Sequence, residues 1–383
     1  MNLFIVPSWY PTKLHPEAGT FFRDQAQILS IRGFDITIIS LVQHSLRDFF
    51  NYKSAPEIWR RENQLRILQK ETINCYPKLE RLAFRSYQTF AVNLLKQGIN
   101  KRGKPDAVYI QSSLWAGAAL GSFFNNHNIP FAVSEHLLNF LQDDGFSAFQ
   151  KSAIEKSYQY AHSIVATSLA LKKSISQQFS KTSSKIRIIP NPANISVFQI
   201  KSTKISSDFQ FVSVALFRPE KRLDLLLNAF SKVHKVYNNT HLTLVGDGPL
   251  QNQIKKQIQT LKLRSAVTLT GYINKQDVAR QLQNSDIFVL SSDVETFGVA
   301  PIEAMACGLP VLATNCGGPL DYVTQETGLI VQTNNVQSLA EGMMNLIVNY
   351  EKYCPKTIRL FVKNKYGDKM YADLVRSMLT LSV

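Results

Sequence analysis

Two carboxylates, Glu295 and Glu303, flank a short glycine-containing segment in the last third of the chain. Residues 297–299 lie between them, and Pro301 follows, a residue that the first turn of a helix tolerates. The start of a helix presents free amides, and a glycine lets a ligand approach the backbone, so this segment could bind an anion. Carboxylates are good acceptors for sugar hydroxyls. The pattern favours a ligand with a phosphate at one end and a polyol at the other, although single glutamates are commonly only solvated.

The elements around these residues are typical of an α/β sheet. Short apolar runs at 287–290 and 311–313 suit parallel strands that are covered on both faces. A helix from Pro301 to Gly308 is expected between them. The loop with Glu295 therefore opens at the carboxyl end of a strand, where such sheets bind ligands.

The run Glu295-TFGVAPI-Glu303, followed by AMACGLPV, resembles the signature of retaining glycosyltransferases of family 4. The resemblance implies an α/β fold with two Rossmann-like domains facing across a cleft, the GT-B fold. It further implies that Glu295 contacts a donor sugar, that Glu303 binds the nucleotide ribose, and that three backbone amides face the sugar and diphosphate. These are the amides of Phe297, Gly298 and Val299.

The first half of the chain contributes two further candidates. Gly19 follows the first expected strand, and it resembles the family's N-terminal glycine loop, in which Ala18 replaces a second glycine. His136 follows the strand expected at 131–134, and a histidine at a strand end is placed to reach a cleft. The resemblance implies that both residues lie near the donor. It further implies that His136 is a catalytic residue beside the sugar and pyrophosphate.

The second half contributes a cation and several turn residues. Lys221 begins an expected helix and could meet a diphosphate as a point charge. The family usually has an arginine five residues earlier, where this chain has Leu216, and Arg218 could supply that guanidinium by another route. The resemblance also implies contacts with the nucleotide from Gly246, Gly248, Tyr272 and Ile273.

At 383 residues the chain is longer than the chains that usually fold around a single hydrophobic core, so two domains are expected. The predicted division is an acceptor-side domain at 1–195, a polar linker at 196–208 and a nucleotide-sugar domain at 209–362. Residues 363–383 are expected to form a terminal helix that crosses back to the first domain, as in the family.

These features predict a metal-independent retaining transferase that moves a sugar from a nucleotide diphosphate to an acceptor hydroxyl. The chain contains no Asp-x-Asp pair for a metal and diphosphate, and no cofactor is expected beyond the donor itself. The family mechanism implies attack on the face from which the diphosphate leaves, so no general base is assigned. Because Leu216 departs from the pattern, a non-catalytic nucleotide-sugar-binding protein and a sugar-nucleotide epimerase remain alternatives.

The net charge of +15 lies mostly in the first 200 residues, where 23 Lys and Arg outnumber 13 Asp and Glu by ten. Charge without a basic binding motif is weak support for a nucleic-acid partner, which is not expected. A region rich in cations and aromatics at 44–104, including Phe49, Phe50, Trp59 and the pair Arg60-Arg61, leaves two interpretations open. One is a solvated basic face, and the other is a peripheral site on an anionic membrane.

The expected acceptor is a glycan or lipid-linked molecule, used in polysaccharide or glycolipid biosynthesis. The start of the chain lacks signal-peptide features, and its four separated cysteines suit free thiols. We therefore expect a cytoplasmic protein, at most associated with the inner face of the membrane.

Overall fold

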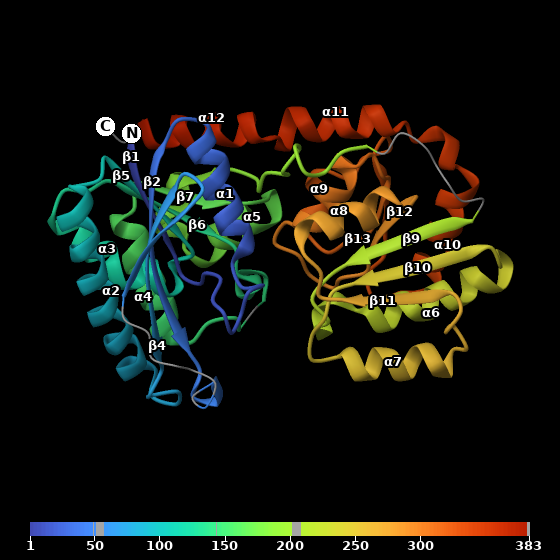
Figure 1. Cartoon of the computed structure of the whole chain (residues 1–383), viewed down its shortest axis with the longest axis horizontal. Helices are drawn as coiled ribbons and strands as arrows, with labels where there is room; N and C mark the ends of the chain where they lie inside the picture. Colours follow the sequence, from blue (N-terminus) through green and yellow to red (C-terminus); the bar gives the residue numbers. More distant parts are fainter. Residues whose placement is uncertain (49, 51–56, 143, 201–207, 381–383) are drawn as a thin grey trace. The chain divides into compact units, whose positions relative to one another are not determined.

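The computed structural model describes residues 1–48, 50, 57–142, 144–200 and 208–380. The chain divides into two compact units, Met1–Pro190 with Tyr371–Val383, and Asn191–Met370 (Figure 1). Each unit contains its own largely parallel sheet with helices on both faces. The fold class is therefore α/β with two Rossmann-like sheets, as the sequence predicted.

The sheet of the first unit has the strand order β3-β4-β2-β1-β5-β6-β7-β8, and all neighbouring pairs are parallel except β3 with β4. The strands are β1 (Asn2–Pro7), β2 (Asp35–His44), β3 (Ile58–Glu62), β4 (Leu65–Ile73), β5 (Ala107–Gln111), β6 (Phe131–Glu135), β7 (Ser163–Ala166) and β8 (Ile186–Ile188). The helices of this unit are α1 (Thr20–Ile31), α2 (Glu80–Arg102), α3 (Ala118–Asn126), α4 (Ala148–Tyr160) and α5 (Leu169–Gln178), with most of α12 (Asp368–Thr380).

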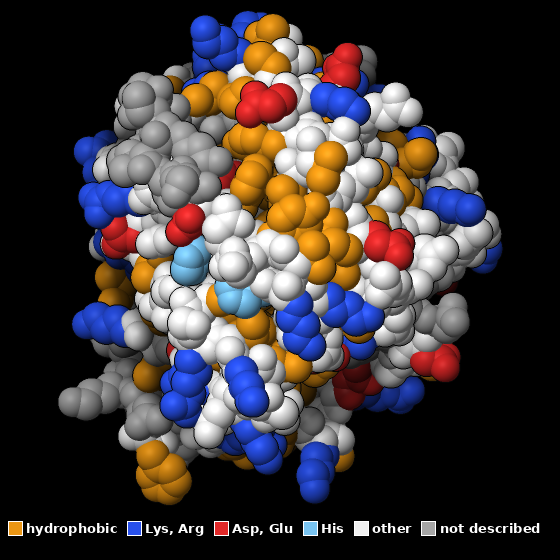
Figure 2. Space-filling view, turned by 90° about the vertical axis from the view of Figure 1, so that its right-hand side faces the viewer, with side chains coloured by type: hydrophobic (Ala, Val, Ile, Leu, Met, Phe, Trp, Pro, Cys, Tyr) orange, Lys and Arg blue, Asp and Glu red, His pale blue; other side chains and the backbone are white. Residues whose placement is uncertain are grey.

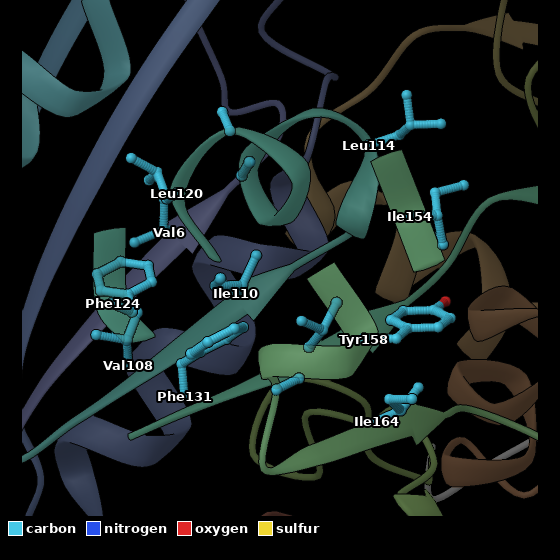
Figure 3. Close-up of a cluster of buried hydrophobic side chains, with 14 of the residues drawn as sticks. Val6, Val108, Ile110, Leu114, Leu120, Phe124, Phe131, Ile154, Tyr158 and Ile164 are labelled. Carbon is cyan, nitrogen blue, oxygen red and sulfur yellow. The ribbon is translucent and has the colours of Figure 1, made fainter. Parts of the chain in front are cut away.

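Alternating side chains of β1 divide the core of the first unit into two layers. Phe4 and Val6 pack with residues of α2, α3 and α4, in the cluster that Figure 3 shows. Leu3 and Ile5 pack on the other face with residues of α1 and α12. A period of two is what a strand that is buried on both faces requires, since successive side chains point to opposite sides.

The second unit repeats this plan with the strand order β11-β10-β9-β12-β13-β14, all parallel. Its strands are β9 (Phe209–Val214), β10 (Thr240–Val245), β11 (Val267–Gly271), β12 (Ile287–Leu290), β13 (Val311–Thr314) and β14 (Gly328–Val331). Its helices are α6 (Leu223–Val236), α7 (Gln251–Thr260), α8 (Lys275–Gln283), α9 (Val299–Ala306), α10 (Val336–Val348) and α11 (Pro355–Tyr366). In β12, Phe288 and Leu290 pack with α9, while Ile287 and Val289 pack with α6 and α10.

In both sheets, the direction in which the chain adds strands reverses at an inner pair of strands. In the second unit, β9 leads outward to β10 and β11, and β12 leads the opposite way to β13 and β14. The loops after β9 and β12 therefore diverge at a topological switch point, where open α/β sheets bind their ligands. These are the loops that carry Lys221 and Glu295.

The structure shows three local features that the sequence did not predict. In the described part of residues 44–104, a 3₁₀ helix spans Leu46–Asp48, residues 58–73 form the β3–β4 hairpin, and α2 spans Glu80–Arg102. Lys221 does not begin a helix but ends a 3₁₀ turn, Pro219–Lys221, that precedes α6. The C-terminal residues form two helices separated at Gly367, since α11 ends at Tyr366 and α12 starts at Asp368.

Figure 2 views the second unit from the side on which its strands begin, and the hydrophobic side chains there gather between groups of Lys and Arg. Val236 and Val348, the last residues of α6 and α10, are 66% and 70% exposed. Within the described part of the chain, no helix has the length and apolar character needed to cross a bilayer.

Candidate functional site

An ion pair joins the loops after β9 and β12. The Nζ atom of Lys221 lies 2.6 Å from Oε1 of Glu295, and the two side chains are 19% and 8% exposed. The hydroxyl of Ser292 donates a second hydrogen bond, 2.8 Å long, to the same carboxylate oxygen. A nearly buried carboxylate is thus held by one cation and one hydroxyl at the carboxyl ends of the strands, as a buried charge requires.

The turn that carries Lys221 is fastened to the Glu295 loop by neighbouring residues. Arg222 adopts a left-handed conformation, with φ of 48°, and its Nη1 lies 3.1 Å from both carboxylate oxygens of Asp293. The amide of Asp293 donates to the carbonyl of Glu220, and the hydroxyl of Ser291 donates to the carbonyl of Lys221. Arg222, Asp293 and the two serines were not among the predicted site residues. For Ser291, Ser292 and Asp293, the signal in the sequence was the polar run directly after the apolar strand β12.

The backbone of the Glu295 loop rests on the two glycines that follow β13. Glu295 donates its amide to Cys316 and accepts from the amide of Gly318, at 2.7 and 2.9 Å. A Cβ on Gly318 would lie 2.4 Å from Cα of Phe297, so only glycine fits there. The Phe297 side chain is buried and packs against Tyr322. Only the backbone of Phe297 is therefore available to a ligand.

Helix α9 starts directly after this loop. Gly298, with φ of 83°, is its N-cap residue, and the hydroxyl of Tyr322 donates to the carbonyls of Phe297 and Gly298. The amides of Phe297, Gly298 and Val299 find no acceptor among the described residues, as is usual at a helix start. These three donors, with the positive end of the helix, form an anion-binding geometry.

Glu303 lies one turn into α9, and its side chain is 15% exposed. Its Oε1 lies 3.9 Å from Nζ of Lys275, the first residue of α8, and that ammonium also lies over the ring of Phe198. Glu295 and Glu303 therefore lie in the same unit, one before and one after the start of α9 in the chain, and each lies beside a lysine.

The loop after β10 packs on the loop after β9. A Cβ on Gly246 would lie 1.9 Å from the carbonyl oxygen of Ala215, and one on Gly248 would lie 2.8 Å from backbone atoms of Phe217. The amide of Gly246 donates to Gly271 at the end of β11. Exposed Tyr272 and half-buried Ile273 follow Gly271, so the structure brings these four predicted residues together at one edge of the sheet.

Arg218 and Leu216 both lie in the loop after β9, and both side chains are exposed. Among the described residues, no carboxylate pairs with the Arg218 guanidinium. The carbonyl of Arg218 accepts from the amide of Lys221, so the arginine belongs to the same turn as the lysine.

Gly19 and His136 belong to the first unit. Gly19 has φ of 67° and is the N-cap residue of α1, and a Cβ there would lie 2.6 Å from the carbonyl oxygen of Trp9. The rings of Phe21 and Phe22, in the first turn of α1, lie 5.3 and 5.0 Å from the His136 ring. The glycine loop and the histidine are therefore connected through one helix.

Burial lowers the pKa of His136 to about 3, so its imidazole is neutral at physiological pH. Its Nε2 lies 2.9 Å from the hydroxyl of Ser134. The preceding residue, Glu135, is fully buried, and its Oε1 accepts from the amide of Ser113 and the hydroxyl of Tyr158. Burial, partly offset by these hydrogen bonds, raises the pKa of Glu135 to about 7. Glu135 was not among the predicted site residues.

One group of described side chains could supply three metal ligands, and it lies in the first unit. Single ligand atoms of His15, His44 and Asp48 lie within 4.8 Å of one another. His44 also pairs with Glu71 at 2.7 Å. The described residues around Lys221 and Glu295 offer no comparable group.

Models of two families match consecutive parts of the chain. Glycosyltransferase family 4 matches residues 18–197, and glycosyl transferases group 1 matches residues 196–358. The full-length matches among solved structures include sucrose-phosphate synthase from Thermosynechococcus elongatus, with a TM-score of 0.80 at 18% identity, covering 100% of both chains. Another is Anabaena HepE in complex with UDP, with a TM-score of 0.76 at 16% identity and the same coverage. The fold is thus that of the GT-B glycosyltransferases.

Curated relatives match over shorter stretches. An uncharacterized glycosyltransferase of Methanocaldococcus jannaschii is 29% identical over 215 residues, which are 54% of this chain and 52% of the relative. An N-acetyl-alpha-D-glucosaminyl L-malate synthase of Bacillus anthracis is 32% identical over 142 residues, 37% of this chain and 36% of the relative. The chain spans about half the length or less of such relatives. The chain belongs to the group 1 / family 4 glycosyltransferases.

Proposed function

We propose that this protein is a retaining glycosyltransferase that moves a sugar from a nucleoside-diphosphate donor to an acceptor hydroxyl. The observation that carries the proposal is the Lys221–Glu295 pair at the switch point of the second unit, beside the free amides at the start of α9. A cation, a helix N-terminus and a buried carboxylate suit a ligand that joins a diphosphate to a sugar.

Each group has a role in this proposal. Lys221 and the amides of residues 297–299 stabilise the negative charge that develops on the diphosphate as it leaves. Glu295 orients Lys221 and accepts a hydrogen bond from a sugar hydroxyl. Glu303 accepts hydrogen bonds from the ribose, while Gly246, Gly248, Tyr272 and Ile273 border the nucleotide. Arg218, with no carboxylate partner in the described structure, serves as a second cation for the diphosphate.

In the first unit, Gly19 and the neutral His136 act on the sugar and acceptor side. With a pKa of about 3, His136 donates or accepts hydrogen bonds without carrying charge. The acceptor hydroxyl attacks the face that the diphosphate leaves, and the departing diphosphate takes up its proton, so no protein group is assigned as general base. The proposed acceptor is a glycan or lipid-linked molecule.

The solved structures suggest which donors to test first. Anabaena HepE has been solved with UDP-glucose, and a starch synthase IV domain from Arabidopsis thaliana with ADP and acarbose. UDP-sugars and ADP-sugars therefore come first in a panel of nucleotide sugars, with release of the nucleoside diphosphate as the measurement. Turnover identifies the donor, and binding without turnover would instead support the non-catalytic alternative. A changed sugar nucleotide without transfer would support an epimerase.

Substitution of each of the two glutamates should distinguish donor binding from turnover. We expect Glu303→Ala to raise the KM for the donor about ten- to a hundredfold, because the loss of a charged hydrogen-bond partner costs about 1.5–3 kcal/mol. Glu295→Ala is expected to lower kcat by a comparable factor, since it leaves Lys221 without the carboxylate that orients it. Near-normal kinetics for both variants at limiting donor would contradict the site assignment.

A further inference from the structure

The first unit contains a hollow of about 340 Å³ that is lined by a tryptophan and five basic residues. Its lining residues are Trp59, Arg60, Arg61, Arg66, Lys101 and Arg102, and they define what we call the basic pocket. They come from both strands of the β3–β4 hairpin and from the last turn of α2. Nothing in the proposed transferase mechanism uses these residues.

The basic pocket lies at the amino ends of the parallel strands, whereas Gly19 and His136 lie beyond the carboxyl ends. Arg66 is the second residue of β4, and its partner Asp35 is the first residue of β2. Gly19 and His136 instead follow the carboxyl ends of β1 and β6. A ligand in the basic pocket would therefore occupy a site separate from Gly19 and His136.

The positive charge of the pocket is only partly balanced. Asp35 pairs with both Arg66 and Arg102, and Glu62 pairs with Arg60 at 2.8 Å. The register places the Arg60–Glu62 pair on the other face of the hairpin, with Ile67 and Leu65. One carboxylate, Asp35, therefore faces the four cations of Arg61, Arg66, Lys101 and Arg102, which leaves a net charge of +3. The Nε of Arg102 is buried and finds no acceptor among the described residues. A concave surface with excess charge of one sign concentrates its field on an oppositely charged ligand.

The arrangement of the cations is unfavourable in the absence of an anion. Arg61 and Arg66 are directly opposite in the antiparallel register, and like charges in that position destabilise a hairpin. Edge-strand charges discourage aggregation, and cations suit a helix C-terminus, but neither effect requires the cations to converge on one hollow.

The indole forms one wall of the pocket. Trp59 and Arg61 lie on the same face of β3, because they are two residues apart. Trp59 packs against the core cluster of Figure 3, and Nζ of Lys101 lies 4.6 Å from its ring centre. Trp59 is therefore a fixed wall, not a side chain that could insert into a bilayer.

We propose that the basic pocket binds a phosphate-bearing anion, either a soluble phosphorylated molecule or the headgroup of an anionic phospholipid. Guanidinium groups match phosphate oxygens in pairs, and a lysine adds a point charge. Of the two interpretations of residues 44–104, a solvated basic face and a peripheral membrane site, the proposal develops the second into one defined site. It does not depend on the transferase activity. Of the aromatics expected there, Phe49 lies outside the described residues, and Phe50 is 94% exposed.

The test compares charge reversal in the pocket with charge reversal elsewhere in the same unit. Arg61→Glu/Lys101→Glu changes two exposed cations that form no ion pair within the described structure. Lys151→Glu/Lys173→Glu makes the same charge change at exposed positions of α4 and α5. Inorganic pyrophosphate is titrated while tryptophan fluorescence is recorded, with Trp59→Phe identifying the signal of the pocket. Sedimentation with phosphatidylglycerol and phosphatidylcholine vesicles is measured in parallel.

We expect the pocket variant to lose at least about tenfold in affinity for pyrophosphate, for phosphatidylglycerol vesicles or for both, and the control to stay within about twofold. Loss for pyrophosphate alone identifies a soluble ligand, and loss for vesicles alone identifies a headgroup. Equal binding by wild type and pocket variant, or equal loss in the control, overturns the proposal. If the double reversal lowers the melting temperature, Arg61→Gln and Lys101→Gln provide the same comparison with less perturbation. Because no donor is present, the outcome is independent of whether the protein transfers sugar.

Discussion

At the scale of residues, the candidate site depends on a pair of charges that must be kept together. Glu295 is only 8% exposed at its side chain, so its charge is compensated by the protein and not by water. The Lys221 ammonium supplies that compensation and is also the group that we propose to face the diphosphate. Stability and function are therefore coupled at the same ion pair.

This coupling predicts the behaviour of a double-mutant cycle. Lys221→Met should lower the free energy of unfolding by about 3–5 kcal/mol, because it leaves a buried carboxylate unpaired. Adding Glu295→Gln removes that charge and should recover at least about 1 kcal/mol. Urea unfolding of the four proteins measures the coupling energy. Strictly additive effects would show that the two side chains do not interact in solution.

The raised pKa of Glu135 predicts that the stability of the protein depends on pH. Its pKa is about 7 in the fold against an ordinary value of 4.5, so the folded state binds the proton more tightly than the unfolded chain. The free energy of unfolding should therefore fall as pH rises from about 4.5 to 7, by about 1.4 kcal/mol per unit. Glu135→Gln mimics the protonated acid and keeps an acceptor for Tyr158.

We expect the stability of Glu135→Gln, relative to wild type, to increase by about 2–3 kcal/mol between pH 5 and pH 8. Chemical denaturation at these two pH values measures the change. The other titrating groups are common to both proteins, so their contributions cancel to first order. A constant difference between the two proteins would mean that Glu135 does not titrate in this interval.

At the scale of elements, glycines fix how the loops of the second unit pack. The loop after β12 lies directly on the turn after β13, and the loop after β10 lies on the loop after β9. In both places a side chain would collide with backbone and not with a flexible side chain. The glycines therefore determine the position of Glu295 and of the nucleotide-facing loop.

Gly318→Ala tests this packing. Its methyl group would lie 2.4 Å from Cα of Phe297, so the loop with Glu295 must move. We expect a loss of about 1–3 kcal/mol in stability and a larger loss in donor turnover. Gly121→Ala in α3 is the control, because the nearest heavy atom would be Cζ of Phe131 at 3.4 Å. Equal effects of the two substitutions would argue against a specific role for the Gly318 contact.

At the scale of the whole molecule, both units are α/β sheets that place polar loops at the carboxyl ends of their inner strands. The first unit also carries the basic pocket, which lies at the amino ends of the parallel strands of its sheet.

The four cysteines are free, and burial raises the pKa of Cys307 and Cys316 to about 12, so these two thiols are protonated.

The proposed charge balance at the diphosphate predicts resistance to chelators. Lys221, Arg218 and the α9 amides would neutralise the leaving group, so donor turnover should persist in excess EDTA. The assay is release of nucleoside diphosphate with and without the chelator. Loss of turnover that a divalent ion restores would contradict metal independence. Asp48→Asn would then show whether the ion acts through His15, His44 and Asp48.

The sequence alone determined the features that arise from neighbouring residues. Apolar runs predicted the buried strands β12 and β13. A strand that is covered on both faces has apolar side chains at nearly every position, so it forms a continuous apolar run in the sequence. The Glu295–Glu303 segment identified the family, since its glycine, proline and carboxylates are local in the chain. Local patterns also placed Gly246 and Gly248 in turns, but they did not indicate what those turns contact.

Only the tertiary structure decided which distant residues meet. Lys221 and Glu295 are 74 residues apart and form one ion pair because β9 and β12 are adjacent in the sheet. Glu135 meets Tyr158 across 23 residues, and Arg61 faces Arg66 only because residues 58–73 form a hairpin. Strand order and register decide such contacts, and they follow from the packing of the whole sheet, which no single window of sequence contains.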